Sequence, residues 1–243
     1  MRIAILQPGY LPWFGFFEQM IRVDHFVYLD DVQYTKQDWR NRNRIKTPDG
    51  TAWLTVPVRK VPVDTPINRV RIDQSQRWVN KHIRLIHHGY RKAPFCDHLM
   101  DELTSVLQRR HELLQDLCVD LIGLINRKLN IVTPTSFAST LGIQETNKTQ
   151  RLVAICQSMG ADALYDGKAA ADFIESKQFE DANIDLIFQD YAHPVYPQLW
   201  GDFSSYLSTI DLIFNCGPDA RKVLENRQSE LPHGSSREPI CTM

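Results

Sequence analysis

The sequence predicts an α/β protein with a mostly parallel sheet and helices on both faces. Short apolar runs alternate with segments of helical periodicity through most of the 243 residues, and this alternation is typical of linked β-α-β units. The first apolar run, residues 3–6, is uninterrupted, as in a strand that is buried on both faces. A chain of this length, with 43% hydrophobic residues, buries a sizeable core without disulfides or metals.

The first sixty residues are expected to hold a β-α-β unit and an inserted hairpin. The strand at 3–6 leads through a loop with Pro and Gly into a helix at 13–23, and a second strand follows at 25–29. Basic residues then occupy every second position, and a Pro-Asp-Gly turn leads to a returning apolar run. This pattern predicts a β-hairpin over residues 39–58.

The rest of the chain is expected to alternate helices with strands. The predicted helices are 78–90, a helical segment at 95–129 that divides into two, 149–159, 168–175 and 204–216. The predicted strands are 67–72 beside the hairpin, 130–133, 163–165 and 184–188. One domain over 1–225 accounts for these elements, and the polar residues 226–243 are expected to form a loose tail.

The composition narrows the classes of partner and compartment. A net charge of −1 argues against nucleic acid as a partner, because general nucleic-acid binders carry a basic excess. No segment approaches the roughly 18 uninterrupted apolar residues of a membrane span. Five cysteines without C-x-x-C spacing are a poor secreted framework, so we expect a cytoplasmic protein. The sequence identifies no metal site, no cofactor and no oligomeric state.

The first candidate site residues follow the first two strands. In open parallel sheets, ligands bind at the carboxyl ends of the strands. After the first strand, Gln7 offers an amide, while Tyr10 and Trp13 offer stacking faces for a sugar or a base. After the second strand, Asp30 or Asp31 is the candidate general base or binds an amine. The alternatives are a rigid loop that plugs the sheet and a pair of carboxylates that cap a turn or helix.

A second group of candidates lies on the expected hairpin. Arg40, Arg42 and Arg44 share one face of an extended segment, and guanidinium groups match phosphate oxygens bidentately. Trp39 stands beside them, and Asn43 lies on the opposite face, where it meets other polar groups or belongs to a site. We therefore predict a phosphate or diphosphate site. The alternative is an edge strand whose charges prevent pairing with other strands.

A third observation concerns one carboxylate in an apolar segment. Asp211 lies within residues 207–214, which are otherwise largely apolar. A buried carboxylate needs partners, because an unpaired charge away from water is costly. Basic residues of the hairpin are the candidates for this role.

Four stretches of the sequence carry a resemblance to a known family. They are Gln7-Pro8-x-Tyr10-Leu11-Pro12-Trp13-x-Gly15, Asp30-Asp31-Val32-Gln33-Tyr34, Trp39-Arg40-Asn41-Arg42-Asn43 and Trp53-Leu54-Thr55-Val56-Pro57-Val58. They resemble the WbqC-like family, and further matches extend the resemblance to about residue 217. Gln33 joins the candidate substrate-binding residues through this resemblance. The opening strand, loop, helix and acid-ended strand also resemble the start of nucleotidylyltransferase-like folds, but the H-x-G-H signature is replaced by Trp13-Phe14-Gly15-Phe16.

The resemblance implies a function in bacterial surface-polysaccharide (O-antigen) biosynthesis. Family members are similar to proteins encoded among the genes for these polysaccharides, which implies a small-molecule substrate such as a nucleotide-sugar. Together with the candidate residues, this favours an enzyme, a transferase that moves an acyl, aminoacyl or glycosyl group on a nucleotide-activated sugar. Two alternatives stay open. They are an ATP-dependent ligase related to nucleotidylyltransferases, and a non-enzymatic scaffold in polysaccharide assembly.

Overall fold

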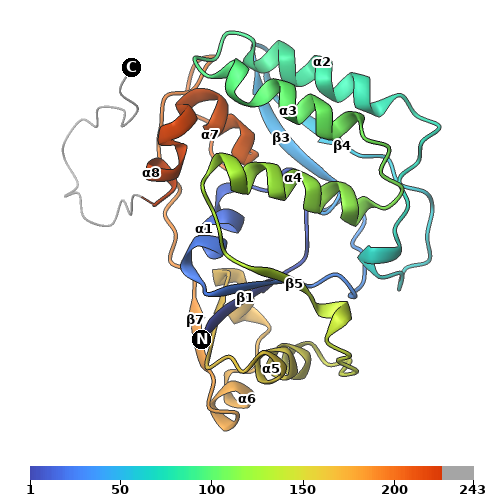
Figure 1. The fold of residues 1–243 in the computed structure, drawn as a ribbon, viewed down its shortest axis with the longest axis vertical. Coiled ribbons are helices and arrows are strands. Elements are labelled where there is room, and N and C mark those ends of the chain that lie inside the picture. Colours follow the sequence, from blue (N-terminus) through green and yellow to red (C-terminus); the bar gives the residue numbers. More distant parts are fainter. Residues whose placement is uncertain (226–243) are drawn as a thin grey trace.

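The computed structural model describes residues 1–225 and is built around one parallel sheet (Figure 1). Its five strands are β1 (Arg2–Leu6), β2 (His25–Tyr28), β5 (Thr135–Phe137), β6 (Ala163–Asp166) and β7 (Asp185–Phe188). They lie in the order β5-β2-β1-β6-β7, and every neighbouring pair is parallel. The predicted α/β fold with a parallel sheet is confirmed.

Helices cover both faces of this sheet, as predicted (Figure 1). One face carries α1 (Phe14–Arg22), α2 (Trp78–Tyr90), α3 (Cys96–Gln108), α4 (Leu114–Lys128), α7 (Thr209–Cys216) and α8 (Ala220–Glu225). The other face carries α5 (Lys148–Met159) and α6 (Ser176–Asp181). Each face of the sheet packs against its own hydrophobic core, and successive strand residues alternate between the two faces. Ala4 therefore belongs to the larger core, with α1, and Ile5 to the smaller core, with α5.

The predicted inserted hairpin is also present. It consists of β3 (Arg42–Thr47) and β4 (Gly50–Thr55), which pair antiparallel and form a separate two-stranded sheet. The hairpin packs beside α2 at the end of the molecule farthest from α5 and α6 (Figure 1). Gly89 of α2 permits this approach, because a Cβ atom there would lie 2.5 Å from the carbonyl oxygen of Lys46.

Two predicted strands differ from the structure. The strand expected at 130–133 is absent, and the strand that follows α4 is β5. The reason is the end of α4, where Asn130 adopts a left-handed conformation (φ 51°) and Ile131 donates its N–H to the carbonyl oxygen of Asn126. Pairing with β2 therefore starts only at Pro134. In place of the strand expected at 67–72, Ile67–Arg69 form a 3₁₀ turn, and Ile72 makes an isolated bridge to Val58.

Two predicted helices are shorter than expected. Residues 168–175 hold only the 3₁₀ helix η3 (Lys168–Asp172), and α6 follows it as a separate helix. The helix expected at 204–216 starts at Thr209 because the residue before it bonds elsewhere. Ser208 donates its N–H to Arg44, and its hydroxyl caps the helix by accepting from Ile210. The tail expected over 226–243 lies outside the described residues.

A buried carboxylate joins α7, α2 and the hairpin. Asp211 has no exposed surface, and its oxygens accept hydrogen bonds from the hydroxyls of Tyr90 (2.8 Å) and Tyr196 (2.5 Å) and from the amide of Gln198 (2.8 Å). The ammonium group of Lys46 donates to the amide oxygen of this Gln198 side chain at 3.2 Å. Burial raises the pKa of Asp211, and the three donors and Lys46 oppose this rise. The expected basic residue of the hairpin is therefore present as Lys46, and the side chain of Gln198 connects it to the carboxylate of Asp211.

Replacing Asp211 with alanine should lower the free energy of unfolding by roughly 3–5 kcal/mol, because three buried donors lose their acceptor and Lys46 loses a nearby negative charge. Denaturant titration followed by circular dichroism measures the loss. Asp101→Ala on the exposed side of α3 is the matched control and should change the free energy by about 0.5 kcal/mol or less. Equal losses in the two variants would contradict this role for Asp211.

No helix within residues 1–225 is both long enough and apolar enough to cross a membrane.

Candidate functional site at the carboxyl edge of the sheet

The strand order indicates where a doubly wound sheet usually binds a ligand, which here is at the carboxyl ends of β1 and β6. Numbered by their order along the chain, the five strands lie 3-2-1-4-5, so the direction of winding reverses between β1 and β6. The chain leaves β1 toward α1 on the larger core and leaves β6 toward η3 and α6 on the smaller core. In doubly wound sheets, ligands bind in the crevice that this reversal opens at the carboxyl ends of the strands.

The loop from Gln7 to Trp13 follows β1 at this edge of the sheet. The amide oxygen of Gln7 is buried and has no hydrogen-bond partner within the described residues. The half-buried Trp13 ring folds over Gly15, with its centroid 6.2 Å from that of Tyr191 and 5.6 Å from that of Tyr206. Gln7 and Trp13 therefore stay in the candidate site.

Tyr10 and Asn43 were expected to bind substrate, but both are buried and hold the fold together. The ring of Tyr10 has no exposed surface, and its hydroxyl lies 2.9 Å from Nδ1 of His82. Burial lowers the pKa of His82 to about 4, so its ring is neutral and can accept this hydrogen bond. Asn43 donates to the carbonyl oxygen of Leu11 at 2.7 Å, which ties the hairpin to the N-terminal loop.

Asp30 and Asp31, the expected catalytic carboxylates, are both engaged by the protein. Asp30 is buried and accepts from the backbone N–H and the hydroxyl of Ser139 at 2.9 and 2.7 Å. It therefore ties the end of β2 to the turn after β5. Asp31 forms a short ion pair with Arg151 of α5 and keeps one buried oxygen without a hydrogen bond. Asp30 is therefore fully engaged by the protein, whereas one oxygen of Asp31 has no hydrogen-bond partner among the described residues.

The hairpin and the residues just before it carry a group of two exposed aromatic and two partly buried basic side chains, which we call the Trp–Arg surface. It comprises Trp39, Trp53, Arg42 and Arg44. The two indole rings are each 45% exposed, and their centroids lie 5.5 Å apart. The guanidinium carbons of Arg42 and Arg44 lie 4.4 and 5.7 Å from the centre of the Trp53 ring. The predicted neighbourhood of tryptophan and arginine is present, with Trp53 in addition.

The charges of the Trp–Arg surface lack partners. Within residues 1–225, no carboxylate lies within 4 Å of Arg42 or Arg44, and the buried Nε of each has no hydrogen bond. Arg40, expected on the same face, precedes β3 and turns inward, where its Nε lies 3.9 Å from Asp38 and burial lowers its pKa. Gln33 is exposed and pairs with Pro66 in an isolated bridge.

The two halves of the site adjoin through the backbone. Tyr10 donates its N–H to the carbonyl oxygen of Trp39 at 3.2 Å. The chain approaches so closely here that a Cβ atom on Gly9 would lie 2.9 Å from the same oxygen. The N-terminal loop that leaves β1 therefore runs directly beside the Trp–Arg surface.

Sequence reasoning did not select Asp166, which ends β6 on the other side of the switch point. Its Oδ1 accepts from the N–H of Gly167 at 2.7 Å, and it forms no ion pair within the described part of the chain. Burial raises the pKa of this carboxyl group to about 6. Asp30 was predicted as a site residue because it is a carboxylate at the carboxyl end of a strand, and Asp166 has the same position in the sequence pattern.

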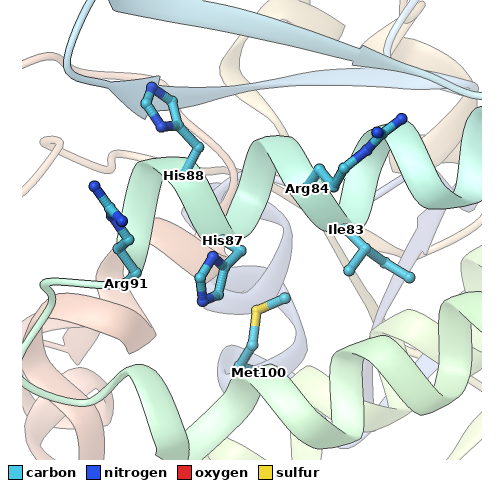
Figure 2. A pocket seen from close by; sticks show the side chains of 6 residues that line it. All are labelled: Ile83, Arg84, His87, His88, Arg91 and Met100. Carbon is cyan, nitrogen blue, oxygen red and sulfur yellow. The ribbon is translucent and has the colours of Figure 1, made fainter.

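A hollow of about 290 Å³ lies elsewhere, along α2 and α3 (Figure 2). Its lining side chains are Ile83, Arg84, His87, His88, Arg91 and Met100. In Figure 2, His88 and Arg84 point away from His87 and Met100, so the charged groups do not converge on one point. Among residues 1–225, no cluster of three or more His, Cys, Asp or Glu side chains is arranged to hold a metal.

Replacing Tyr10 with phenylalanine should lower the free energy of unfolding by about 1–2 kcal/mol, because a buried imidazole nitrogen loses its hydrogen-bond donor. Urea denaturation measures the effect. The exposed Tyr206 provides the control, since Tyr206→Phe should have the stability of the wild type. An unchanged stability of Tyr10→Phe would remove the structural role assigned to its hydroxyl.

Replacing Asp166 with asparagine should raise the free energy of unfolding at pH 8 and leave it nearly unchanged at pH 4. The folded-state pKa of about 6 lies above the ordinary value of 3.8, so the folded protein holds a proton that the unfolded chain releases between these values. Ionisation therefore costs the wild type up to about 3 kcal/mol of stability as the pH rises through 6. Denaturant titrations of both proteins at pH 4 and 8 measure the difference. A variant that is less stable than the wild type at pH 8 would contradict the direction.

The comparisons with known proteins identify one matching family and one similar protein. The model of the WbqC-like protein family matches residues 7–223, which include the Trp–Arg surface and both sides of the switch point. The chain is 36% identical over 222 residues to the uncharacterized protein Rv1507c of Mycobacterium tuberculosis, covering 90% of this chain and 95% of the relative. No solved structure matches the chain significantly. The protein belongs to the WbqC-like protein family.

Proposed function

We propose that the chain is a cytoplasmic enzyme of surface-polysaccharide biosynthesis, a transferase that moves an acyl, aminoacyl or glycosyl group on a nucleotide-activated sugar. The observation that carries this proposal is the Trp–Arg surface. Two guanidinium groups without carboxylate partners stand over an exposed indole ring, beside the loop that leaves β1. Membership of the WbqC-like family supports the same broad area of metabolism.

The chemistry of this surface fits a ligand that combines phosphate with a ring. Planar guanidinium groups form paired hydrogen bonds to phosphate oxygens, and like charges held close together gain most from an anion between them. Exposed indole rings offer flat faces on which a sugar or a base can stack. Leaving this apolar surface in water is unfavourable, and a bound ligand would cover it. A nucleotide-sugar supplies a diphosphate and two ring systems in one molecule.

A second candidate function rests on the strand order. A doubly wound sheet with its winding reversal between β1 and β6 is a common framework for nucleotide binding, which favours an ATP-dependent ligase or a relative of the nucleotidylyltransferases. This reading places the nucleotide at the switch point and requires Mg²⁺ to be supplied with the ATP. The first function therefore predicts binding of a nucleotide-sugar without a metal ion, whereas the second predicts binding of ATP together with Mg²⁺.

Calorimetric titration of the full chain with UDP-glucose, UDP and ATP–Mg²⁺ tests the proposal. We expect UDP-glucose to bind, and Arg42→Ala to weaken its binding at least about tenfold through the loss of a charged fork. Arg42→Lys should give an intermediate affinity, because lysine offers a point charge in place of two parallel donors. The rank order of these three proteins separates a phosphate contact from a general loss of packing.

The matched control is Arg2→Ala. Arg2 begins β1 at the opposite edge of the sheet and is exposed, so its removal should leave the affinity for UDP-glucose unchanged. Binding of ATP–Mg²⁺ alone would favour the second candidate. Failure of a panel of UDP-, dTDP-, GDP- and CMP-sugars, together with ATP–Mg²⁺, to bind would favour the scaffold alternative. Unchanged binding by Arg42→Ala would remove the Trp–Arg surface from the site.

A further inference from the structure

We infer that α2 carries a surface that binds the negatively charged headgroups of a phospholipid bilayer. Five basic side chains form this surface, which we call the α2 row. They are Arg77, Lys81, Arg84, His88 and Arg91. Successive members lie three or four residues apart, so they share one side of the helix and extend over about 21 Å. All five are exposed, and in Figure 2 Arg84 and His88 point away from Met100 of the neighbouring α3.

The segment around α2 contains no negative charge of its own. Between Asp73 and Asp97 the chain holds five lysine and arginine residues and no acidic residue. The whole chain has a net charge of −1, so the remaining residues together carry a charge of −6. Positive charge is therefore concentrated on this helix in a chain that has no overall basic excess. Such a local concentration attracts anions although the net charge does not reveal it.

The protein does not neutralise the α2 row. Within residues 1–225, no carboxylate lies within 4 Å of its lysine or its three arginines, and only His88 approaches one, at 3.8 Å from the exposed Asp49. The Nε of Arg84 donates to the carbonyl oxygen of Asn80 in the same helix at 3.3 Å, which leaves its charge uncompensated. In the neighbouring α3, Glu102 pairs with basic residues of α4 instead.

Neither pairing on the helix nor helix stability explains the α2 row. On other surface helices, a basic residue stands four positions from an acidic one. Lys177 lies 2.7 Å from Asp181 in α6, and Arg221 lies 2.7 Å from Glu225 in α8. Like charges at this spacing repel each other and destabilise a helix. Arg77 is unfavourable in addition, because it stands at the N-terminus, where the helix dipole favours negative charge. An anionic partner would remove both costs.

The setting of α2 favours a flat partner over a nucleic acid. The helix lies at the outer edge of the molecule (Figure 1), between the hairpin and α3 (Figure 2). A helix flanked on both sides does not protrude far enough to enter a nucleic-acid groove. Its aromatic side chains, Trp78 and Tyr90, are buried, so neither can stack on the bases of a single strand. A bilayer surface presents negative charge along the whole length of the row.

The association should be electrostatic and reversible. The apolar side of α2, with Trp78, Ile86 and Tyr90, already belongs to the larger core. The helix therefore has no apolar face left to insert among the acyl chains, and the row contacts headgroups alone. Binding of this kind requires anionic lipid and is screened by salt, because the Debye length falls from about 10 Å at 0.1 M to about 3 Å at 1 M.

Co-sedimentation of the full chain with phospholipid vesicles tests this assignment. The vesicles consist of phosphatidylcholine alone or with about one third phosphatidylglycerol. We expect binding only to the vesicles with phosphatidylglycerol, at about 50 mM NaCl, and loss of this binding at about 500 mM. The double variant Lys81→Ala/Arg84→Ala should bind about 25-fold more weakly, since each basic group near an anionic surface contributes about fivefold.

The matched control removes the same charge from the other end of the molecule. Lys148→Ala/Lys177→Ala changes two exposed lysines of α5 and α6 and should bind within about twofold of the wild type. Circular dichroism checks that both variants are folded. Equal binding to the two kinds of vesicle, no binding to the anionic vesicles at low salt, or equal losses in the two variants would overturn the inference.

A nucleic acid is the competing partner, and the same proteins test it. Tighter binding of a single-stranded or duplex RNA than of the anionic vesicles, weakened in Lys81→Ala/Arg84→Ala alone, would also overturn the assignment to a bilayer. None of the residues in the α2 row belongs to the Trp–Arg surface. Any of these results would therefore leave the proposed function standing.

Discussion

The carboxylate of Asp211 brings together segments that lie far apart in the sequence. It receives donors from α2 and from the stretch after β7, and through the Gln198 amide it is linked to Lys46 of the hairpin. Burial makes such a charge costly, so the arrangement holds only while all donors are in place. Tyr90 strengthens the connection, because its hydroxyl also accepts the backbone N–H of Lys46 at 3.0 Å. Asp211 is therefore the buried centre of one of the connections that position the hairpin relative to the sheet.

This connection matters because the hairpin carries the Trp–Arg surface while the sheet carries the switch point. The Asp211 network holds the two together on one side. On the other side, the side-chain amide of Asn43 donates to the carbonyl oxygen of Leu11, and the N–H of Tyr10 donates to the carbonyl oxygen of Trp39. The side chains that hold the site in place thus have hydrogen-bond partners, whereas Gln7, Arg42 and Arg44 each keep a polar atom without one. A division of this kind preorganises a site without using its binding groups for stability.

The sequence predicted the class of fold and most of the elements, because these depend on local periodicity and on turn residues. It could not predict which polar side chains form hydrogen bonds with residues far away in the sequence. Tyr10 meets His82 across 72 residues, and Asp30 meets Ser139 across 109, so neither contact leaves a local pattern. The position of β6 beside β1 could not be predicted either, because apolar runs do not reveal which strands become neighbours.

The pairing of β1 with β6 also determines when the candidate site can exist during synthesis of the chain. The first strand, its helix, the hairpin and the three helices after it can all form on the ribosome from residues made early. The switch point cannot, because one of its two strands lies more than half a chain length later. Until residue 166 has emerged, the edge of β1 that receives β6 stays unpaired and open to other strands. The step that completes the site is therefore also the step that protects the nascent chain from aggregation.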